Sequence, residues 1–460
     1  MATFYVQNFG CRATQADGAA IERQFRDRGM EPADAPSTAT VVVLNTCTVT
    51  AAADQDARAA IRRVHRENPG CQIVVTGCYA QRAPEEIAAL PGVTQVVGNS
   101  HKHQLANLAV GTRNFVPLTD LGTENRELKT EIYISDIFAH TELLAAPVFD
   151  AVGGARTRPN LKVQDGCDNR CSFCVIPHVR GQSRSLPLSE ILRQVHSLVD
   201  VGYRELVISG INLGRWGRDL AKSVWSGRPR PLRFEDLVRS ILEQTLLEKL
   251  RISSVEPMDW SDGLIRLVAE SPRIAKHAHV PLQSGSDRIL RKMHRKYRPS
   301  HYREKIEKIR AAMPTTAIGA DVMVGFPGET DADFEETRRL IEDLPFTYLH
   351  VFTYSSRPGT PAAAMPNQVP VQVARERNRI LRELATQKKQ AFMRGFVGKT
   401  IEAITLKEFD GTHTEALTDN YLKLGLKGRH APNRWLRAAA ERVEGDTLIG
   451  MASTDPGLVS

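Results

Sequence analysis

The sequence predicts an α/β protein with three parts: an N-terminal doubly wound parallel-sheet domain, a partial (βα)6 barrel and a small C-terminal β-barrel. Three observations predict this fold class. Short runs of Val, Ile and Leu alternate with helical patterns over the first 100 residues and again from about residue 158. After Gly395 the pattern changes to short strands. At 460 residues the chain is also too long for one ordinary domain.

The first part, residues 1–117, carries four predicted strands. Apolar runs at 4–6, 41–44, 73–75 and 93–97 predict the strands, and helical patterns lie near 17–29, 54–67 and 84–90. Continuous apolar strands separated by helices indicate a parallel sheet that is covered on both faces. Such a doubly wound sheet binds its ligands at the carboxyl ends of the strands.

The second part is a longer βα series over residues 158–391, after a predicted linker at 118–157. Its predicted strands are 160–165, 204–209, 249–254, 277–281, 317–324 and 347–353, and a long helix near 370–393 closes it. Six alternations predict an open or partial barrel, whose site residues gather at the C-terminal ends of the strands. Segments such as 401–406 and 421–426 predict a small β-barrel within residues 392–460.

Composition narrows the function classes. Hydrophobic residues make up 42% and charged residues 25%, which is typical of a soluble globular protein. No apolar run approaches the roughly 18 residues of a membrane span, and the first residues do not read as a signal peptide. We therefore expect a cytoplasmic protein with no membrane partner. The net charge of +8 favours a polyanionic partner such as RNA.

Three of the seven cysteines, Cys167, Cys171 and Cys174, fall within one short loop after the predicted strand at 160–165. Disulfides are not expected in a reducing compartment, which leaves metal or cluster ligation, or plain burial. Closely spaced thiolates suit zinc or an iron–sulfur cluster. A structural zinc ion requires a fourth ligand, for which His178 is the candidate. Three ligands on a four-iron cluster instead leave one iron open to bind a substrate.

Three further cysteines, Cys11, Cys47 and Cys78, fall at or just after the first three predicted strands. The carboxyl ends of neighbouring parallel strands meet at one edge of a sheet, so we expect these distant thiols to converge. The geometry is compatible with a second three-cysteine cluster. Cys71 stands at the start of a strand instead and is expected to be a buried or incidental thiol.

The motif C-x3-C-x2-C at 167–174, with Phe173 before its last cysteine, resembles the radical S-adenosylmethionine signature. In that superfamily the open iron of the cluster binds the amino and carboxylate groups of S-adenosylmethionine. Reductive cleavage then gives a 5′-deoxyadenosyl radical. The segment Ser209-Gly210-Ile211-Asn212 stands where the family contacts the methionine amine.

The sequences around both cysteine triads are similar to the methylthiotransferases. Segments 8–11, 45–50 and 76–81 match their amino-terminal domain, segments 280–285 and 324–330 match their radical core, and the C-terminal part resembles a TRAM domain, a small RNA-binding barrel. The resemblance implies two 4Fe-4S clusters and the use of two S-adenosylmethionine molecules. One cluster, on Cys167, Cys171 and Cys174, generates the radical, and the other, on Cys11, Cys47 and Cys78, donates sulfur. The S-adenosylmethionine contacts that it implies are Gly210, Ile211, Asn212, Ser254, Gln283 and Gly325.

Segments 208–214, 251–257 and 351–355 look most like the group that acts on N6-threonylcarbamoyladenosine of tRNA. This group inserts a methylthio group at carbon 2 of N6-threonylcarbamoyladenosine in the anticodon stem-loop, with an electron donor such as a flavodoxin or ferredoxin. Two alternatives within the family act on N6-isopentenyladenosine of tRNA or on an aspartate of a ribosomal protein. An alternative of another class is a non-catalytic iron–sulfur scaffold that binds RNA.

Candidate RNA contacts come from runs of basic residues. The run 291–298 contains five Lys or Arg and one Tyr, and it either contacts phosphates and stacks a base or is a solvated helix end. Arg180 and Arg184 either steer a phosphate or a cofactor carboxylate or solvate a loop. An acid-free stretch of the C-terminal part contributes Lys423, Lys427, Arg429, Arg434, Trp435 and Arg437.

Overall fold

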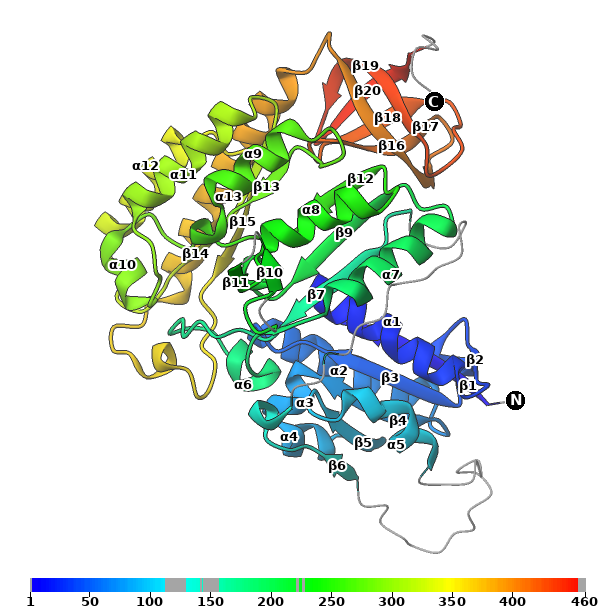
Figure 1. Cartoon of the computed structure of the whole chain (residues 1–460). Coiled ribbons are helices and arrows are strands. Elements are labelled where there is room, and N and C mark those ends of the chain that lie inside the picture. Colours follow the sequence, from blue (N-terminus) through cyan, green and yellow to red (C-terminus); the bar gives the residue numbers. More distant parts are fainter. Residues whose placement is uncertain are drawn as a thin grey trace, which may run out of the picture.

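The N-terminal sheet is entirely parallel, with the strand order β2-β1-β3-β4-β5-β6. The computed structural model (Figure 1) describes residues 2–111, 130–140, 143, 157–220, 223–225 and 228–453. The strands are β1 (Thr3–Asn8), β2 (Glu31–Pro32), β3 (Val41–Thr46), β4 (Gln72–Gly77), β5 (Val93–Gly98) and β6 (Glu131–Tyr133). The order reverses between β1 and β3, which confirms the doubly wound prediction. Strand β6 comes from the segment predicted as a linker, whose mixed polar composition did not indicate it.

Helices cover both faces of this sheet. Helices α1 (Arg12–Arg26) and α5 (Leu105–Gly111) pack on one face. The other face carries α2 (Ala51–Glu67), α3 (Cys78–Arg82) and α4 (Pro84–Ala88). Strands β3, β4 and β5 are almost completely buried, as their continuous Val and Ile runs predicted, whereas most residues of β1 are half-buried.

The second part contains six parallel strands. They are β7 (Asn160–Asp165), β9 (Glu205–Gly210), β12 (Lys249–Ile252), β13 (His277–His279), β14 (Ala317–Val324) and β15 (Tyr348–Thr353). Hydrogen-bonded ladders join β12-β9-β7 and β13-β14-β15, and bridges at Leu250–Ile274 and Ser254–His279 connect the two groups. A short antiparallel strand, β8 (Arg184–Ser185), extends β7, and β10 (Ser223–Trp225) pairs with β11 (Arg228–Arg230). The predicted partial barrel is confirmed.

Helices surround the outer side of these strands. They are α7 (Leu188–Asp200), α8 (Phe234–Gln244), α9 (Asp262–Glu270), α10 (Asp287–Lys292), α11 (Pro299–Ala312), α12 (Asp331–Asp343) and α13 (Val371–Arg394). Helix α6 (Ile176–Arg180) instead packs against α3 of the N-terminal domain. Alternate strand residues such as Leu206 and Ile208 join the hydrophobic core under the helices. The residues that alternate with them, such as Glu205 and Val207, face the barrel interior. Helix α1 of the N-terminal domain packs against β7 and β9 (Figure 1), so it lies over the open side of the barrel.

The C-terminal part is a closed five-stranded barrel with the order β16-β17-β18-β20-β19. Its strands are β16 (Thr400–Phe409), β17 (His413–Thr418), β18 (Lys423–Lys427), β19 (Trp435–Glu444) and β20 (Thr447–Ala452). Its core includes Leu424, Leu426 and Leu448 and continues onto Met393 at the end of α13. Within the described ranges, no helix combines the length and the apolar character needed to cross a membrane.

Candidate functional site

The core triad, Cys167, Cys171 and Cys174, occupies a tight loop between β7 and α6. The Cys167 amide donates to the carbonyl of Gly181 at 3.1 Å, and the Cys174 amide donates to the carbonyl of Cys171 at 3.1 Å. Gly166, with φ of +71°, starts the loop, and a Cβ there would lie 1.9 Å from the carbonyl oxygen of Gln182. The loop therefore requires glycine at this position. All three thiols are partly accessible.

Hydrogen-bond donors surround two of these sulfurs. The Cys167 sulfur accepts from the amide of Asn169 at 3.4 Å and from Asn212 Nδ2 at 3.5 Å. The Cys171 sulfur accepts from Arg295 Nη1 at 3.3 Å. Burial raises the pKa of Cys174 to about 12, so the charge of a bound metal is needed to hold it as a thiolate. Donors directed at sulfur are the surroundings that an iron–sulfur cluster requires.

The N-terminal triad forms at the carboxyl edge of the first sheet. Cys11 caps α1 after β1, Cys47 follows β3, and Cys78 begins α3 after β4. Gly10 permits close approach, because a Cβ there would lie 2.7 Å from the Cβ of Cys47. Burial, followed by the neighbouring Cys78 and Cys11, raises the pKa of Cys47 to about 12. Strand topology thus brings three thiols together that are far apart in the sequence.

Cys71 does not join either group. It is 3% exposed at the start of β4 and packs in the hydrophobic core of the N-terminal domain. Burial raises its pKa to about 11. The prediction of a buried thiol at this position is confirmed.

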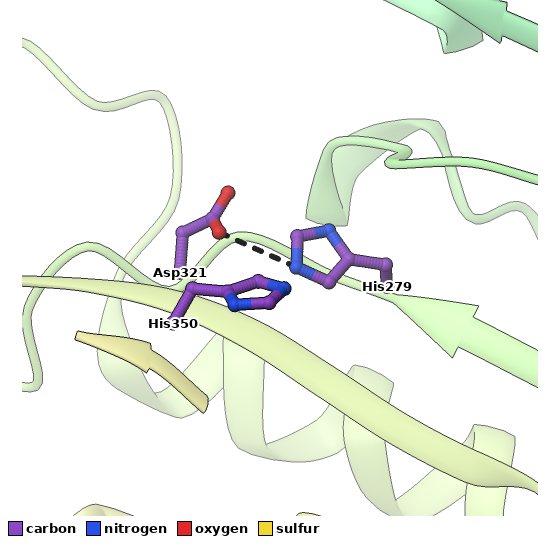
Figure 2. A group of neighbouring side chains, drawn as sticks. All are labelled: His279, Asp321 and His350. Atoms are coloured by element: carbon purple, nitrogen blue, oxygen red, sulfur yellow. Dashed lines mark ion pairs between the residues drawn. The ribbon is translucent and has the colours of Figure 1, made fainter. Parts of the chain in front are cut away.

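Neither triad has the geometry of a single-ion site. Among the described residues, one group of at least three His, Cys, Asp or Glu side chains has its ligand atoms within 4.8 Å of one another: His279, Asp321 and His350 (Figure 2). His178 is exposed on α6 and belongs to no such group. The zinc interpretation of the 167–174 loop is therefore not supported. Thiols of a four-iron cluster bind different irons and stand further apart, so both triads fit a cluster better than a zinc ion.

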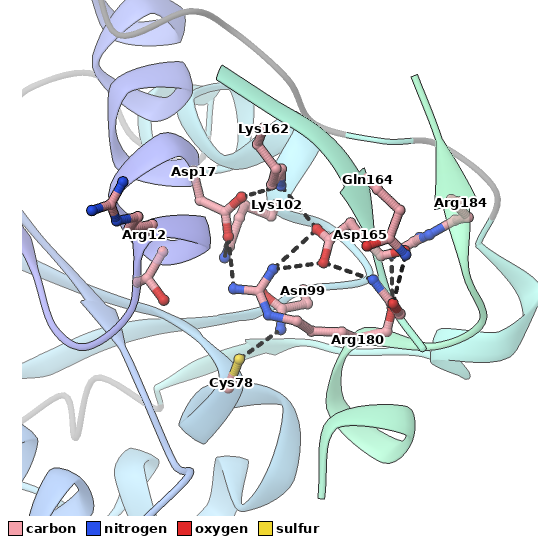
Figure 3. Close-up of polar contacts among 12 residues, drawn as sticks. Arg12, Asp17, Cys78, Asn99, Lys102, Lys162, Gln164, Asp165, Arg180 and Arg184 are labelled. Atoms are coloured by element: carbon pink, nitrogen blue, oxygen red, sulfur yellow. Dashed lines mark hydrogen bonds and ion pairs between the residues drawn. The ribbon is translucent and has the colours of Figure 1, made fainter. Parts of the chain in front are cut away.

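A buried network of five charged side chains lies beside the N-terminal triad (Figure 3). Asp17 on α1 accepts from Lys102 at 3.0 Å, from Arg180 at 3.0 Å, and from Lys162. Asp165 accepts from Arg180 at 2.9 Å and from Lys162 at 2.8 Å. Burial alone would raise the pKa of Asp17, but Lys102, Lys162 and Arg180 hold it far below its usual range. The network ties α1 of the N-terminal domain to β7 and α6 of the barrel.

The same region connects the two triads. Asn99 Nδ2 donates to the carbonyl of Val179 at 2.7 Å and lies 3.6 Å from the sulfur of Cys78. Cys78 also packs against Val175 and Val179 of the segment that follows Cys174. One layer of side chains therefore separates the two cysteine sites.

Both sequence interpretations of Arg180 were wrong. Arg180 is 2% exposed, so it neither solvates a loop nor faces a free phosphate. Its guanidinium is occupied by Asp165 and Asp17. Arg184 donates to the carbonyls of His140 and Arg180 instead of lying free in a loop.

The predicted S-adenosylmethionine contacts follow the carboxyl ends of successive barrel strands. Gly210, Ile211 and Asn212 follow β9, where Gln164 Oε1 accepts from the Asn212 amide at 2.7 Å. Ser254 follows β12, Gln283 follows β13, and Gly325 follows β14. These positions therefore share the barrel edge that carries the core triad.

Two of these residues have unusual backbone conformations. Gln283 adopts φ of +64°, which is uncommon for a residue other than glycine and is found at binding sites. Gly325 has φ of +77°, and a Cβ there would lie 2.6 Å from the Cβ of Ala374 on α13. Packing against α13 is thus a structural reason for glycine at position 325.

The basic run 291–298 does not form one RNA-facing surface. Arg295 is buried and reaches Cys171 and Glu256, while Tyr297 is 2% exposed and donates to the carbonyls of Pro281 and Leu282. The expectation that this tyrosine stacks a base is wrong. Sequence analysis also missed Arg295 as a neighbour of the cluster cysteines. The signal was absent, because a run of charges does not show which members turn inward.

The basic residues of the C-terminal barrel are arranged differently. The five cations of the predicted acid-free stretch lie on the surface: Lys423, Lys427, Arg429, Arg434 and Arg437. Trp435 is only partly exposed, and Lys249 Nζ of the barrel strand β12 lies 4.9 Å from its ring centroid. The tryptophan thus contributes to the contact between two domains.

Comparison with known proteins agrees with this geometry. Residues 161–341 match a family described as the Radical SAM superfamily, and residues 3–98 match the Uncharacterized protein family UPF0004. The structure of the radical S-adenosylmethionine methyltransferase TsrM from Kitasatospora setae superposes with a TM-score of 0.54 at 15% identity, covering 79% of this chain and 75% of that one. This likeness shows the fold alone.

Several proteins are more similar to this chain in sequence. The Threonylcarbamoyladenosine tRNA methylthiotransferase MtaB of Bacillus subtilis is 37% identical over 93% of this chain and 91% of its own. The MtaB of Aquifex aeolicus is 36% identical over 92% and 96%. A tRNA-2-methylthio-N(6)-dimethylallyladenosine synthase of Novosphingobium aromaticivorans is 35% identical over 87% and 86%. Similarity of this extent, together with the radical SAM fold and the two cysteine triads, shows that the chain belongs to the radical S-adenosylmethionine methylthiotransferase family.

Proposed function

We propose that this enzyme methylthiolates carbon 2 of N6-threonylcarbamoyladenosine, next to the anticodon of tRNA. The observation that carries the proposal is the presence of two cysteine triads on facing sheet edges, one layer of side chains apart. One triad is enough to generate a radical, so the second indicates a further task, which in this family is sulfur donation. The names of the MtaB relatives support the substrate.

We assign one 4Fe-4S cluster to each triad and S-adenosylmethionine to the barrel edge. When bound, these cofactors supply the radical and the sulfur chemistry. The chain supplies the surroundings of both cofactors. Asn212 and Arg295 donate hydrogen bonds to the sulfurs of Cys167 and Cys171. The strand ends against which S-adenosylmethionine binds are provided by Gly210, Ile211, Ser254, Gln283 and Gly325. Two molecules of S-adenosylmethionine are consumed for each product.

Substrate RNA would meet the exposed cations of the C-terminal barrel. Lys423, Lys427 and Arg429 lie on or just after β18, and Arg434 and Arg437 flank the start of β19. Cations on a small barrel contact phosphates without reading sequence. We place the enzyme in the cytoplasm, where tRNA and a flavodoxin or ferredoxin are both present.

The test uses anaerobically reconstituted enzyme, dithionite and S-adenosylmethionine. Three substrates are compared: tRNA carrying threonylcarbamoyladenosine, tRNA carrying isopentenyladenosine, and the ribosomal protein. We expect about eight irons per chain and a methylthio product on the first substrate alone, read by mass spectrometry of nucleosides and peptides. Product on another substrate would reassign the enzyme within the family. Two clusters without any cleavage of S-adenosylmethionine would support the non-catalytic scaffold instead.

A further inference from the structure

One half of the barrel interior is lined by polar side chains, most of them aromatic or imidazole rings. We call this set the interior polar wall; it consists of His277 and His279 of β13, Asp321 of β14, and Tyr348 and His350 of β15. The residues that alternate with them, such as Ala278 and Ala320, pack against the outer helices. Strand alternation therefore directs the wall into the barrel interior.

The wall runs from a buried position to one that solvent reaches. His279 is 8% exposed, and its Nε2 lies 3.3 Å from Oδ1 of Asp321 (Figure 2). His350 is exposed, with its ring centroid 5.6 Å from that of His279. His277 Nε2 lies 2.7 Å from the Tyr348 hydroxyl. The wall therefore extends from the buried His279 to the exposed His350.

The other two domains add one residue each to this wall. Tyr421 of the C-terminal barrel places its ring 4.6 Å from that of His277. Arg12 of helix α1 donates to the Tyr421 hydroxyl at 3.3 Å. No carboxylate within the described residues lies within the 4.0 Å ion-pair distance of Arg12. A guanidinium that has no carboxylate partner among the described residues thus stands beside the rings.

Charge and burial favour the neutral form of His277 and His350. Burial and the charge of Arg251 lower the pKa of His277 far below its usual value, and Arg12 acts in the same direction. Burial and the neighbouring His279 lower the pKa of His350. A neutral imidazole offers one donor and one acceptor, which suits a ligand that has both.

Two buried polar atoms of this interior have no hydrogen-bond partner among the described residues: Nδ1 of His277 and Oε1 of Gln283. Nε2 of His279 has only its ion-pair contact with Asp321. Buried polar atoms are normally satisfied, so unpaired ones point to a polar ligand. An apolar ligand would leave both atoms unpaired.

We propose that the interior polar wall binds the N6 substituent of the target adenosine and selects a polar, anionic one. A threonylcarbamoyl group carries a urea, a hydroxyl and a carboxylate, whereas a dimethylallyl group carries no polar atom. The first can pair with the imidazoles and place its carboxylate on Arg12. This inference rests on the proposed function and names residues that decide between its two tRNA substrates.

A divalent metal ion is the competing occupant, because two imidazoles and a carboxylate are a common ligand set. The surroundings favour an organic ligand. The charge of Arg12 opposes a cation, and the rings of Tyr348 and Tyr421 offer faces against which a base can stack.

The test measures binding of three anticodon stem-loops to the reconstituted holoenzyme by fluorescence anisotropy. They carry threonylcarbamoyladenosine, its methyl ester, or dimethylallyladenosine. For the unmodified enzyme we expect the first to bind at least about tenfold more tightly than either other. Arg12→Gln should abolish the preference over the ester, and His350→Phe should reduce the preference over dimethylallyladenosine. Both side chains are partly or largely exposed, so neither change should unfold the protein.

Arg291→Gln is the matched control, since Arg291 is an exposed cation at the end of α10. It should leave both affinity ratios unchanged, even if all three affinities fall. Equal affinities in the unmodified enzyme would overturn the inference, and product formation on threonylcarbamoyladenosine tRNA would show that the proposed function still stands. A second result would also overturn the inference. In that result the unmodified enzyme binds an extra Zn²⁺, and a His279→Ala/His350→Phe variant loses this ion but keeps the RNA preference. Absence of product from every tRNA would contradict the proposed function itself.

Discussion

The two cysteine triads have different surroundings although both lie at the carboxyl ends of parallel strands. Cys47 and Cys78 are 6% and 2% exposed and stand beside a network of three cations and two carboxylates. Cys11 of the same triad is exposed, whereas the three core cysteines are all of intermediate exposure. Arg295 is the one charged hydrogen-bond partner of the core triad among the described residues. The first site therefore depends on how two domains pack together, and the second depends on one loop. A variant that alters one of the two sites, or its surroundings, should therefore affect that site alone.

The largest effect is expected from removing one cysteine of each triad. Cys174→Ala should lose a cluster and all cleavage of S-adenosylmethionine. Cys47→Ala should lose the other cluster and still cleave S-adenosylmethionine, but form no methylthio product. Iron should fall from about eight to about four per chain in both variants, measured after anaerobic reconstitution.

Cys71→Ala is the control for thiol loss, since Cys71 is buried in the same domain as Cys47 and belongs to no triad. It should keep the full iron content and the full activity. If Cys47→Ala keeps about eight irons, or if Cys71→Ala loses iron, the assignment of the N-terminal cluster is wrong.

The second effect concerns the packing of the two domains. Asp17→Asn removes the carboxylate that pairs with Lys102, Lys162 and Arg180, and it leaves buried cations without compensation. Breaking a buried ion pair in this way costs about 3–5 kcal/mol. Amides of α1 and β7 should then exchange with deuterium about 10²–10⁴-fold faster, measured by mass spectrometry.

The pH dependence of this difference follows from the low pKa of Asp17 in the folded protein. A depressed carboxyl pKa stabilises the fold above the unfolded pKa of about 3.9, and the contribution is lost as the pH falls through the folded pKa. The difference in exchange rate between the unmodified protein and Asp17→Asn should therefore stay constant between about pH 5 and 8. It should shrink as the pH falls below about 4. Asp331→Asn, at an ion pair whose carboxylate is 98% exposed, should not change exchange at any of these values.

Features that depend on hydrophobic periodicity, or on position relative to a strand, could be predicted from the sequence. Apolar runs identified the strands, and cysteines after strand ends identified both triads. The pairing of Asp17 with Lys162 was not predictable, because it joins residues 145 positions apart in two domains. The interior polar wall was missed for a different reason: the alternation His277-Ala278-His279 is visible, but its direction depends on which face the helices cover.

Arg295 shows the same limit within a single segment. In sequence it is one of several cations in a basic run, but His294 adopts φ of +58° and the chain turns there. The Arg295 side chain is then 5% exposed against Cys171 and Glu256. Composition alone does not show that one cation of such a run is directed inward while Arg291 stays exposed.

The smallest predicted effect therefore concerns Arg295. A cation that donates to the sulfur of a cluster cysteine stabilises the reduced, more negative state of the cluster. Removal of this cation should therefore lower the reduction potential of the core cluster. A hydrogen bond to a charged group contributes about 1.5–3 kcal/mol, or about 65–130 mV for one electron. Arg295→Gln/Glu256→Gln removes both charges and avoids an unpaired buried carboxylate. Redox titration followed by electron paramagnetic resonance should show the core signal at a lower potential and the N-terminal signal unchanged, with Arg291→Gln as the control. A shift of the N-terminal signal instead would contradict the separation of the two sites.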